Sequence, residues 1–274
     1  MSQWPDSIRA TVVLSFDLDA ESLWIARDPK NLERPVTLSQ GEYGPRQGVP
    51  RILKLLKKYD LRATFFVTGW ALERYPETIQ EILACGHEIG HHGYHHEWPD
   101  TLTLEEEREI LHKGIALIRD FDPAGPSGYR SPAWEFSPHT LSLLIDHGFL
   151  YSSNMMNSDL QYRHRIDGRE TGLIEIPVSW TLDDAPYFLY SPRLVGRIIT
   201  DPNHVYSIWE QEYSAFYEEG LCFVLTMHPQ IIGRPARILM LERLIRRMKS
   251  DPGVWFSRAQ DVADYWLKNA SMRS

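Results

Sequence analysis

The sequence has only two cysteines, Cys85 and Cys222, and no run of basic residues longer than two. Two thiols cannot build a disulfide framework, and we expect each to be a buried free cysteine. The formal net charge is −8, and the chain lacks the basic patch of a nucleic-acid-binding protein. An anionic membrane surface is disfavoured for the same reason. We therefore expect no nucleic-acid and no membrane partner.

Long apolar runs are also missing, and none approaches the roughly 20 residues of a membrane-spanning helix. The opening residues, MSQWPDSIRATVVLSF, lack the basic segment and apolar stretch of a signal peptide, so the sequence predicts a cytoplasmic protein. No repeat and no low-complexity linker divides the chain. We predict a single domain over residues 1–274.

Short apolar runs alternate with segments of helical periodicity along the chain. This pattern predicts an α/β fold with a mostly parallel sheet of about seven strands, either open or closed into a barrel. We expect residues 21–47 to form a long loop and residues 152–172 to form an insertion. The expected strands are 11–16, 63–67, 87–90, 127–130, 173–180, 221–228 and 254–257, and the expected helices are 49–60, 76–86, 103–121, 138–148, 203–220, 236–251 and 258–269.

Histidine is concentrated in one short stretch, GHEIGHHGYHHE, at residues 86–97. Five of the eleven histidines lie there: His87, His91, His92, His95 and His96. Neighbouring imidazoles repel one another when protonated, so such clusters are unusual in a plain surface loop. A carboxylate with two imidazoles is a common ligand set for Zn²⁺ and other divalent ions. Three pairs stand four residues apart, and the spacing does not choose among them.

Polar residues follow five of the expected strands. They are Asp17 and Asp19, His92 and His96, Arg130, Asp183 and Asp184, and His228. Because ligand sites of parallel α/β folds form where strands end, all of these side chains are able to converge on one cleft.

Each of these residues also has a non-functional interpretation. Asp17 and Asp19 could form a solvated loop, and the histidines an exposed polar loop. His228 could be a core or turn residue, Arg130 a surface ion pair, and the pair at 183–184 a turn. Three aromatic residues, Trp134, Trp180 and Tyr187, could line a sugar-binding cleft or fill the core, and of these we expect core.

Five ordered motifs together resemble the polysaccharide deacetylase family (carbohydrate esterase family 4, NodB homology). They are SFDLDAE, HHGYHH, YRSPAWEFS, IPVSWTLDDAPYF and LTMHPQIIGRP, and they cover nearly the whole chain. The fourth and fifth are most similar to a branch that includes bacterial peptidoglycan deacetylases of the FDxDAE type. The resemblance implies a distorted TIM-like (β/α) barrel and a single polysaccharide-deacetylase catalytic domain.

The same resemblance implies a role for each matching residue. Asp19, His92 and His96 would hold a divalent metal, for which zinc is the family's usual ion. Asp17 would be the general base and His228 the general acid. Arg130 would orient Asp17, and Asp183 or Asp184 would steady His228. The fourth motif departs from the widespread D-x-x-D-W form, so the choice between these two aspartates stays open.

The leading interpretation is a metal-dependent hydrolase that removes acetyl groups from N-acetylated sugars of the polysaccharide or peptidoglycan type. The alternative is a hydrolase of small cyclic amides, similar to allantoinases, and a third interpretation is a non-catalytic binding protein. Residues 22–47, if folded over the metal, would leave a closed pocket for a small substrate. That segment and the aromatic-rich 203–220 helix could equally be a lid or the interface of a homo-oligomer, and the sequence leaves the oligomeric state open.

Overall fold

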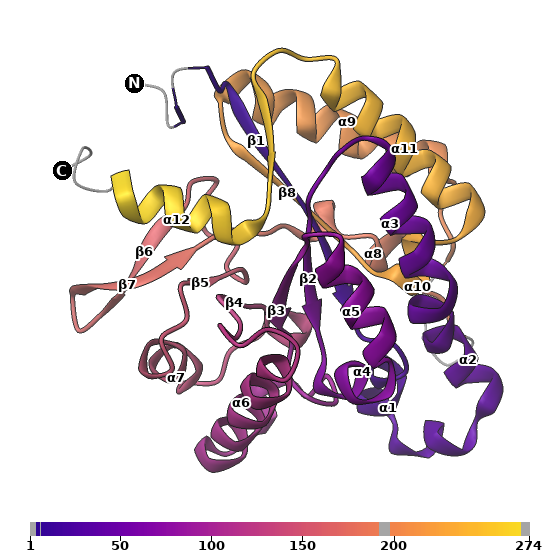
Figure 1. Cartoon of the computed structure of the whole chain (residues 1–274), viewed down its shortest axis with the longest axis vertical. Helices are drawn as coiled ribbons and strands as arrows, with labels where there is room; N and C mark the ends of the chain where they lie inside the picture. Colours follow the sequence, from indigo (N-terminus) through magenta and orange to yellow (C-terminus); the bar gives the residue numbers. More distant parts are fainter. Residues whose placement is uncertain (1–3, 6, 192–197, 270–274) are drawn as a thin grey trace.

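The computed structural model describes residues 4–5, 7–191 and 198–269, and these residues form an α/β fold around one curved sheet (Figure 1). The sheet order is β6-β7-β5-β4-β3-β2-β1-β8, with β9 also paired to β1. Every strand pair is parallel except β6 with β7. The strands are β1 (Ala10–Leu18), β2 (Thr64–Val67), β3 (Glu88–His91), β4 (Gly128–Tyr129), β5 (Tyr151–Ser152), β6 (Tyr162–Ile166), β7 (Arg169–Glu175), β8 (Cys222–Met227) and β9 (Val254–Ser257).

A parallel bridge between Asp183 and Thr226 joins the segment after β7 to β8, the strand at the other end of the sheet. The backbone N–H of Asp184 also donates to the Thr226 carbonyl oxygen at 3.2 Å. The chain after β7 therefore lies beside β8 and completes the distorted barrel that the family resemblance implied, a choice that the strand pattern alone had left open. Two strands were not expected from the sequence. β5 lies at the start of the segment 152–172 that was expected as an insertion, and β6 lies within it.

The main helices surround the strands (Figure 1). They are α3 (Val49–Lys58), α4 (Gly69–Arg74), α5 (Pro76–Ala84), α6 (Leu104–Arg119), α7 (Thr140–Asp146), α9 (Pro202–Glu219), α11 (Pro235–Lys249) and α12 (Ala259–Asn269). Local sequence signals determine where some of these helices begin or end. Thr103 and Glu106 form the expected capping box at the start of α6, and Gly220 ends α9 in the left-handed conformation that glycine adopts freely.

The expectation of a loop over residues 21–47 is wrong. The segment forms α1 (Ser22–Arg27), a 3₁₀ helix (Pro29–Glu33), α2 (Pro35–Tyr43) and a π turn (Gly44–Gly48). These elements are too short for helical periodicity to show in the sequence, and close tertiary contacts hold them. A Cβ at Gly41 would lie 2.5 Å from the Ala20 carbonyl oxygen, so α2 packs directly against the turn after β1.

The strand expected at 173–180 begins and ends earlier, because β7 stops at Glu175. The chain then continues to a 3₁₀ turn (Trp180–Leu182) and the short helix α8 (Ala185–Phe188). This early end carries the following residues across to β8. No helix among the described residues has the length and apolar content needed to cross a bilayer.

The core lies between the strands and their surrounding helices, and β1 is its centre. All nine residues of β1 are buried, and Val12, Leu14 and Phe16 pack into the largest apolar cluster. Such a strand is a rigid support for the polar residues at its end.

Candidate active site

The polar residues singled out from the sequence gather at one edge of the sheet, where the parallel strands end. The set comprises Asp17 and Asp19 at the end of β1, His92 and His96 after β3, Arg130 after β4, Asp183 and Asp184 before α8, and His228 after β8. All are buried, with no more than 6% of any residue's surface exposed. The structure thus brings together every residue that the motifs placed at the site.

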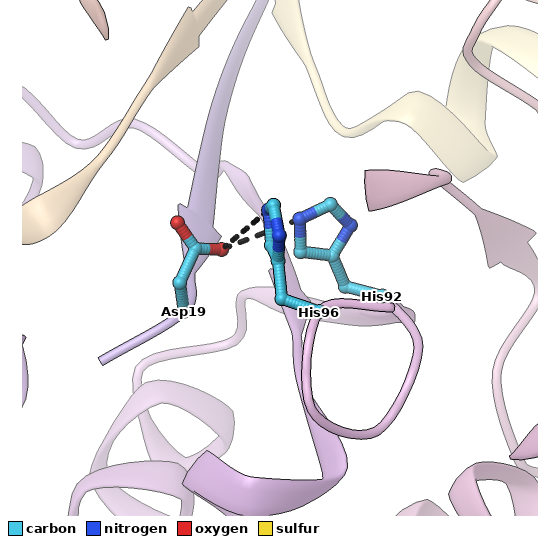
Figure 2. Close-up of side chains that lie close together, drawn as sticks. All are labelled: Asp19, His92 and His96. Atoms are coloured by element: carbon cyan, nitrogen blue, oxygen red, sulfur yellow. Dashed lines mark ion pairs between the residues drawn. The ribbon is translucent and has the colours of Figure 1, made fainter. Parts of the chain in front are cut away.

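Asp19, His92 and His96 form a compact group (Figure 2). The Nε2 atoms of His92 and His96 lie 3.3 and 4.0 Å from Asp19 Oδ1. One potential ligand atom of each residue lies within 4.8 Å of the others. Asp19 Oδ1 and His92 Nε2 are buried and make no hydrogen bond. Because unpartnered buried polar atoms are costly, this group fits a divalent cation that would satisfy them.

His92 and His96 reach a metal-binding state in different ways. Nδ1 of His92 lies 2.7 Å from the Arg130 carbonyl oxygen, which can only accept, so Nδ1 carries a proton and Nε2 is the atom that faces Asp19. Burial opposes the charged form of His92, but the carboxylates of Asp17 and Asp19 raise its pKa, so a cation would bind in exchange for the proton on Nε2. Burial lowers the pKa of His96 to about 4, against the attraction of Asp19. Its imidazole is therefore neutral near pH 7, as a ligand must be.

Several non-glycine residues around the site adopt left-handed backbone conformations. Ala20 has a φ of 51°, His96 of 63°, and Ala133 and Trp134 of 56° each. This region is unfavourable for residues that carry a Cβ, and it persists only where the surrounding structure imposes it. At position 96 this backbone presents the imidazole toward Asp19.

Asp19 has a further partner that the sequence analysis did not identify. Gln230 Nε2 donates to Asp19 Oδ2 at 3.3 Å, and Gln230 is itself buried. Burial would raise the pKa of the Asp19 carboxyl, but the imidazoles of His96, His92 and His228 hold it well below its usual range. The available signal was the position of Gln230, two residues after His228 at the same strand end.

Arg130 fixes Asp17. Its Nη1 donates to Asp17 Oδ1 and to Ser15 Oγ, both at 2.8 Å, while Nη2 donates to Ser153 Oγ at 2.9 Å. The guanidinium carbon lies 4.2 Å from the centre of the Phe66 ring. The second oxygen of Asp17 lies 4.0 Å from His92 Nε2 and so borders the Asp19 group.

Asp184, rather than Asp183, is the direct partner of His228. Asp184 Oδ1 lies 2.6 Å from His228 Nδ1, and its Oδ2 accepts from the His228 backbone N–H at 3.0 Å. Asp183 Oδ1 lies 3.7 Å from the same ring nitrogen and accepts from the Ala185 backbone N–H at 2.7 Å. Nε2 of His228 is therefore left to face Asp19 Oδ2, 3.7 Å away.

The acidic surroundings keep His228 protonated. Burial disfavours the imidazolium, but the carboxylates of Asp184, Asp183 and Asp19 outweigh it and raise the pKa of His228 well above its usual value. Burial and mutual repulsion raise the pKa of the Asp183 carboxyl in turn. The site thus holds a proton donor beside a carboxylate-imidazole group, a pairing suited to acid–base chemistry.

The other three histidines of the cluster have different surroundings. His87 Nδ1 accepts from the Ala63 backbone N–H, and His91 Nδ1 accepts from the Gly93 backbone N–H, each at 3.1 Å. His95 packs against the rings of Trp70 and Tyr94. None belongs to the Asp19 group, in agreement with their omission from the motif-based ligand set.

A cleft of about 580 Å³ opens at the edge of the sheet where Asp17, His92 and His228 lie, and aromatic side chains form part of its walls. Trp98 and Trp180 are 45% and 46% exposed, and Trp134 lies 4.4 Å from Trp180 between ring centres. The expectation that Trp180 fills the core is therefore wrong, because the chain leaves the sheet before it. Trp134 is buried yet also lines the cleft, and half-buried Tyr187 packs against the core.

Comparison with known proteins places this geometry in a family. The polysaccharide deacetylase family model matches residues 31–152. The chain is 34% identical to a peptidoglycan deacetylase of Helicobacter pylori, over 94% of this chain and 96% of that protein.

Similar solved structures support the same family. A Mycobacterium smegmatis protein assigned to the polysaccharide deacetylases is 37% identical, with a TM-score of 0.93 over 98% of this chain and 93% of that one. A PuuE allantoinase is 25% identical, with a TM-score of 0.83 over 99% and 94%. The similarity to the peptidoglycan deacetylase and to the allantoinase favours an enzyme over the non-catalytic interpretation. This chain belongs to the polysaccharide deacetylase family.

Proposed function

We propose that this protein removes acetyl groups from N-acetylated sugars of the polysaccharide or peptidoglycan type, using a divalent cation for which zinc is the first candidate. One observation carries the proposal. The Asp19 group, with its unpartnered ligand atoms, lies between a carboxylate fixed by Arg130 and an imidazole fixed by Asp184. The similarity to the H. pylori peptidoglycan deacetylase supports the substrate class.

Asp19, His92 and His96 would hold the cation. When bound there, it would polarise the amide carbonyl and lower the pKa of a water molecule toward neutrality. The tautomer fixed at His92 and the hydrogen bond from Gln230 to Asp19 keep the ligand atoms aimed at one point.

Asp17 would act as general base. Its Oδ1 is occupied by Arg130, so Oδ2 is the oxygen that takes the proton from water as the water oxygen attacks the carbonyl carbon. The hydrogen bond from Arg130 holds this carboxylate in place and prevents it from turning toward the cation as a fourth ligand.

His228 would act as general acid through Nε2. An amine leaves poorly without a proton, and the Asp184 contact at Nδ1 directs the remaining N–H of the imidazolium into the cleft. The proton would pass from Nε2 to the departing nitrogen as the carbon–nitrogen bond breaks.

A backbone N–H would stabilise the negative charge that develops on the carbonyl oxygen. Within the third motif, the N–H of Ser131 donates to Asn154 and that of Trp134 to the Ser131 carbonyl, while Pro132 has none. The N–H of Ala133, at the cleft wall, is therefore the donor that we assign to this role.

The exposed tryptophans support a sugar substrate, because indole rings bind the apolar faces of sugar rings. The second candidate is a small cyclic amide. It is favoured by the similarity to the allantoinase structure and by Leu23 and Arg27 of α1, which line the cleft and narrow it. Both substrates would use the same Asp17, cation and His228.

The test is a paired measurement of metal content and of activity. Purified protein is assayed for amine release from N-acetylglucosamine oligomers and for opening of allantoin and cyclic imides, before and after chelation. Close to one cation per chain with chelator-sensitive deacetylation would support the proposal. Opening of cyclic amides alone would change the substrate but keep the site. Failure to retain any divalent cation after reconstitution would contradict the mechanism.

A further inference from the structure

A second cavity, of about 860 Å³, adjoins the catalytic cleft. We call it the side compartment. The two cavities share five lining residues: Leu23, Arg27, His96, Trp98 and Leu189. Because His96 lines both cavities and belongs to the proposed cation site, the side compartment borders the reaction centre.

The walls of the side compartment are mostly apolar. Beyond the shared residues, Trp24, Ile25, Pro29 and Leu102 contribute aromatic and aliphatic surface. Polar side chains line the compartment as well, but Asp28 and Asn31 already bond to Arg34, and Glu97 accepts from the backbone N–H groups of Tyr94 and His95. Several hydroxyl groups of a sugar would therefore lack hydrogen-bond partners there, at a cost in affinity. An acetyl group presents only one methyl, which would fill little of this volume. The chemistry of the walls therefore suits a hydrocarbon chain.

The position of the side compartment relative to His228 indicates which part of an amide would enter it. The amine must leave next to His228 Nε2, which borders the cleft. Among the described residues, the side compartment is lined by His96 but by neither His228, Asp17 nor Asp183. The acyl substituent lies on the opposite side of the carbonyl carbon from the leaving nitrogen, so it would point away from His228 and past His96.

We propose that the side compartment binds the acyl chain of the substrate and that the protein hydrolyses N-acyl amino sugars with acyl groups longer than acetyl. This inference rests on the amide hydrolysis proposed above. Water adds its oxygen to the acyl carbon and gives one proton to Asp17, and the carbon–nitrogen bond breaks as His228 donates a proton to the leaving nitrogen. The acyl product leaves as a carboxylate after it loses the second proton of water to solvent, and exchange with solvent returns Asp17 and His228 to their starting protonation states.

The experiment compares N-acetyl-, N-butyryl-, N-hexanoyl- and N-octanoylglucosamine as substrates. Each buried methylene is expected to raise kcat/KM by about fourfold until the compartment is full, so hexanoyl should exceed acetyl by well over tenfold. In parallel, binding of acetate and hexanoate to the metal-loaded protein is measured by calorimetry. Hexanoate should bind more tightly than acetate by a similar factor.

Leu102→Trp narrows the side compartment from a wall that the cleft does not share. It should lower the hexanoyl-to-acetyl ratio of kcat/KM by about tenfold and weaken hexanoate binding. Thr101→Trp, from an exposed position on the same wall, should act in the same direction if Leu102→Trp does not fold. Val36→Trp adds an indole at an 82% exposed position outside both cavities and should leave the ratio unchanged.

The outcomes separate this inference from the proposed function. Hydrolysis of the acetyl substrate with no gain for longer chains, and equal binding of acetate and hexanoate, would overturn the acyl compartment while keeping the deacetylase. Absence of activity on every N-acylglucosamine would contradict the proposed function. If the protein is inactive on every N-acylglucosamine but binds hexanoate, and Leu102→Trp abolishes that binding, the acyl compartment is still supported. If the inactive protein does not bind hexanoate either, both the proposed function and the acyl compartment are overturned.

Discussion

Two groups of three residues in this molecule combine aspartate and histidine in opposite proportions, and their side chains are satisfied differently. Asp19 with His92 and His96, and His228 with Asp183 and Asp184, each bring carboxylate and imidazole atoms within 4.8 Å of one another. In the first group Asp19 Oδ1 and His92 Nε2 have no hydrogen-bond partner. In the second group the carboxylate of Asp184 is bonded twice to His228. Residue types and distances therefore do not distinguish the two groups, whereas the unsatisfied atoms mark the first as the proposed cation site.

The largest expected effect comes from removing a ligand of the first group. Asp19→Asn or His92→Ala should abolish retention of the cation after dialysis, and turnover should fall by more than about 10³-fold, since the cation supplies several kcal/mol of transition-state stabilisation. Metal analysis and kcat measured on the same preparation check this. Asp184→Asn is the matched variant in the second group and should keep the cation. A cation retained by Asp19→Asn would reverse the assignment of the two groups.

The second expected effect concerns the pH profile. The Asp184 carboxylate raises the pKa of His228, so Asp184→Asn should lower that pKa and reduce the protonated fraction near neutral pH. The basic limb of kcat/KM should therefore move to lower pH, with a loss of about 10²-fold at pH 8. Asp183→Asn, which removes the more distant carboxylate, should move the limb less. Equal shifts in the two variants would contradict the choice of Asp184 as the partner.

A smaller effect is expected at Gln230, which touches the first group only through Asp19. Gln230→Ala removes the hydrogen bond to Asp19 Oδ2 and should weaken cation affinity by about 10- to 100-fold, as is typical when a partner of a metal ligand is lost. Competition with a chromogenic chelator measures this affinity. In Gln230→Glu, the new carboxyl group can donate to Asp19 only when it is protonated, so the contact should return only at low pH. Unchanged cation affinity in Gln230→Ala would show that Gln230 does not position Asp19.

The smallest effect belongs to a histidine outside both groups. Burial lowers the pKa of His87 to about 4, so the folded state binds fewer protons than the unfolded state between that value and 6.5. Stability is thus full above pH 6.5 and falls as the pH drops, by about 2 kcal/mol between pH 7.5 and pH 5. His87→Gln removes this titration and should flatten the pH dependence of urea denaturation. An unchanged slope would mean that other groups dominate it.

The motifs and the strand–helix alternation predicted the barrel and the residues that meet at its edge. Strand ends of a parallel sheet lie together whatever the connections between them, so Asp17, His92 and His228 could be placed from sequence. The helices within residues 21–47 could not, because contacts such as Gly41 against Ala20 hold them rather than any local pattern. The early end of β7 and the exposure of Trp180 share one cause, the crossing of the chain to β8.

The choice between the two aspartates was beyond the sequence for a related reason. Asp183 and Asp184 are neighbours in the chain and both are buried, so residue type and burial do not distinguish them. The bridge to Thr226 fixes the register of this segment beside β8, and that register turns Asp184 toward His228 and leaves Asp183 at the start of α8. A single backbone contact therefore decides a side-chain role.

The contact between Asp184 and His228 also depends on closure of the barrel. We call the junction between the segment after β7 and β8 the seam. Among the described residues, backbone pairing across the seam occurs only at Asp183, Asp184 and Thr226, close to the Asp184 carboxylate and the His228 imidazole. Separation of the seam would part Asp184 from His228 while the rest of the sheet stays paired. Mild denaturant should therefore abolish the activity that depends on His228 before global unfolding begins. The backbone amides of the seam should also exchange hydrogen with solvent faster than those of β1.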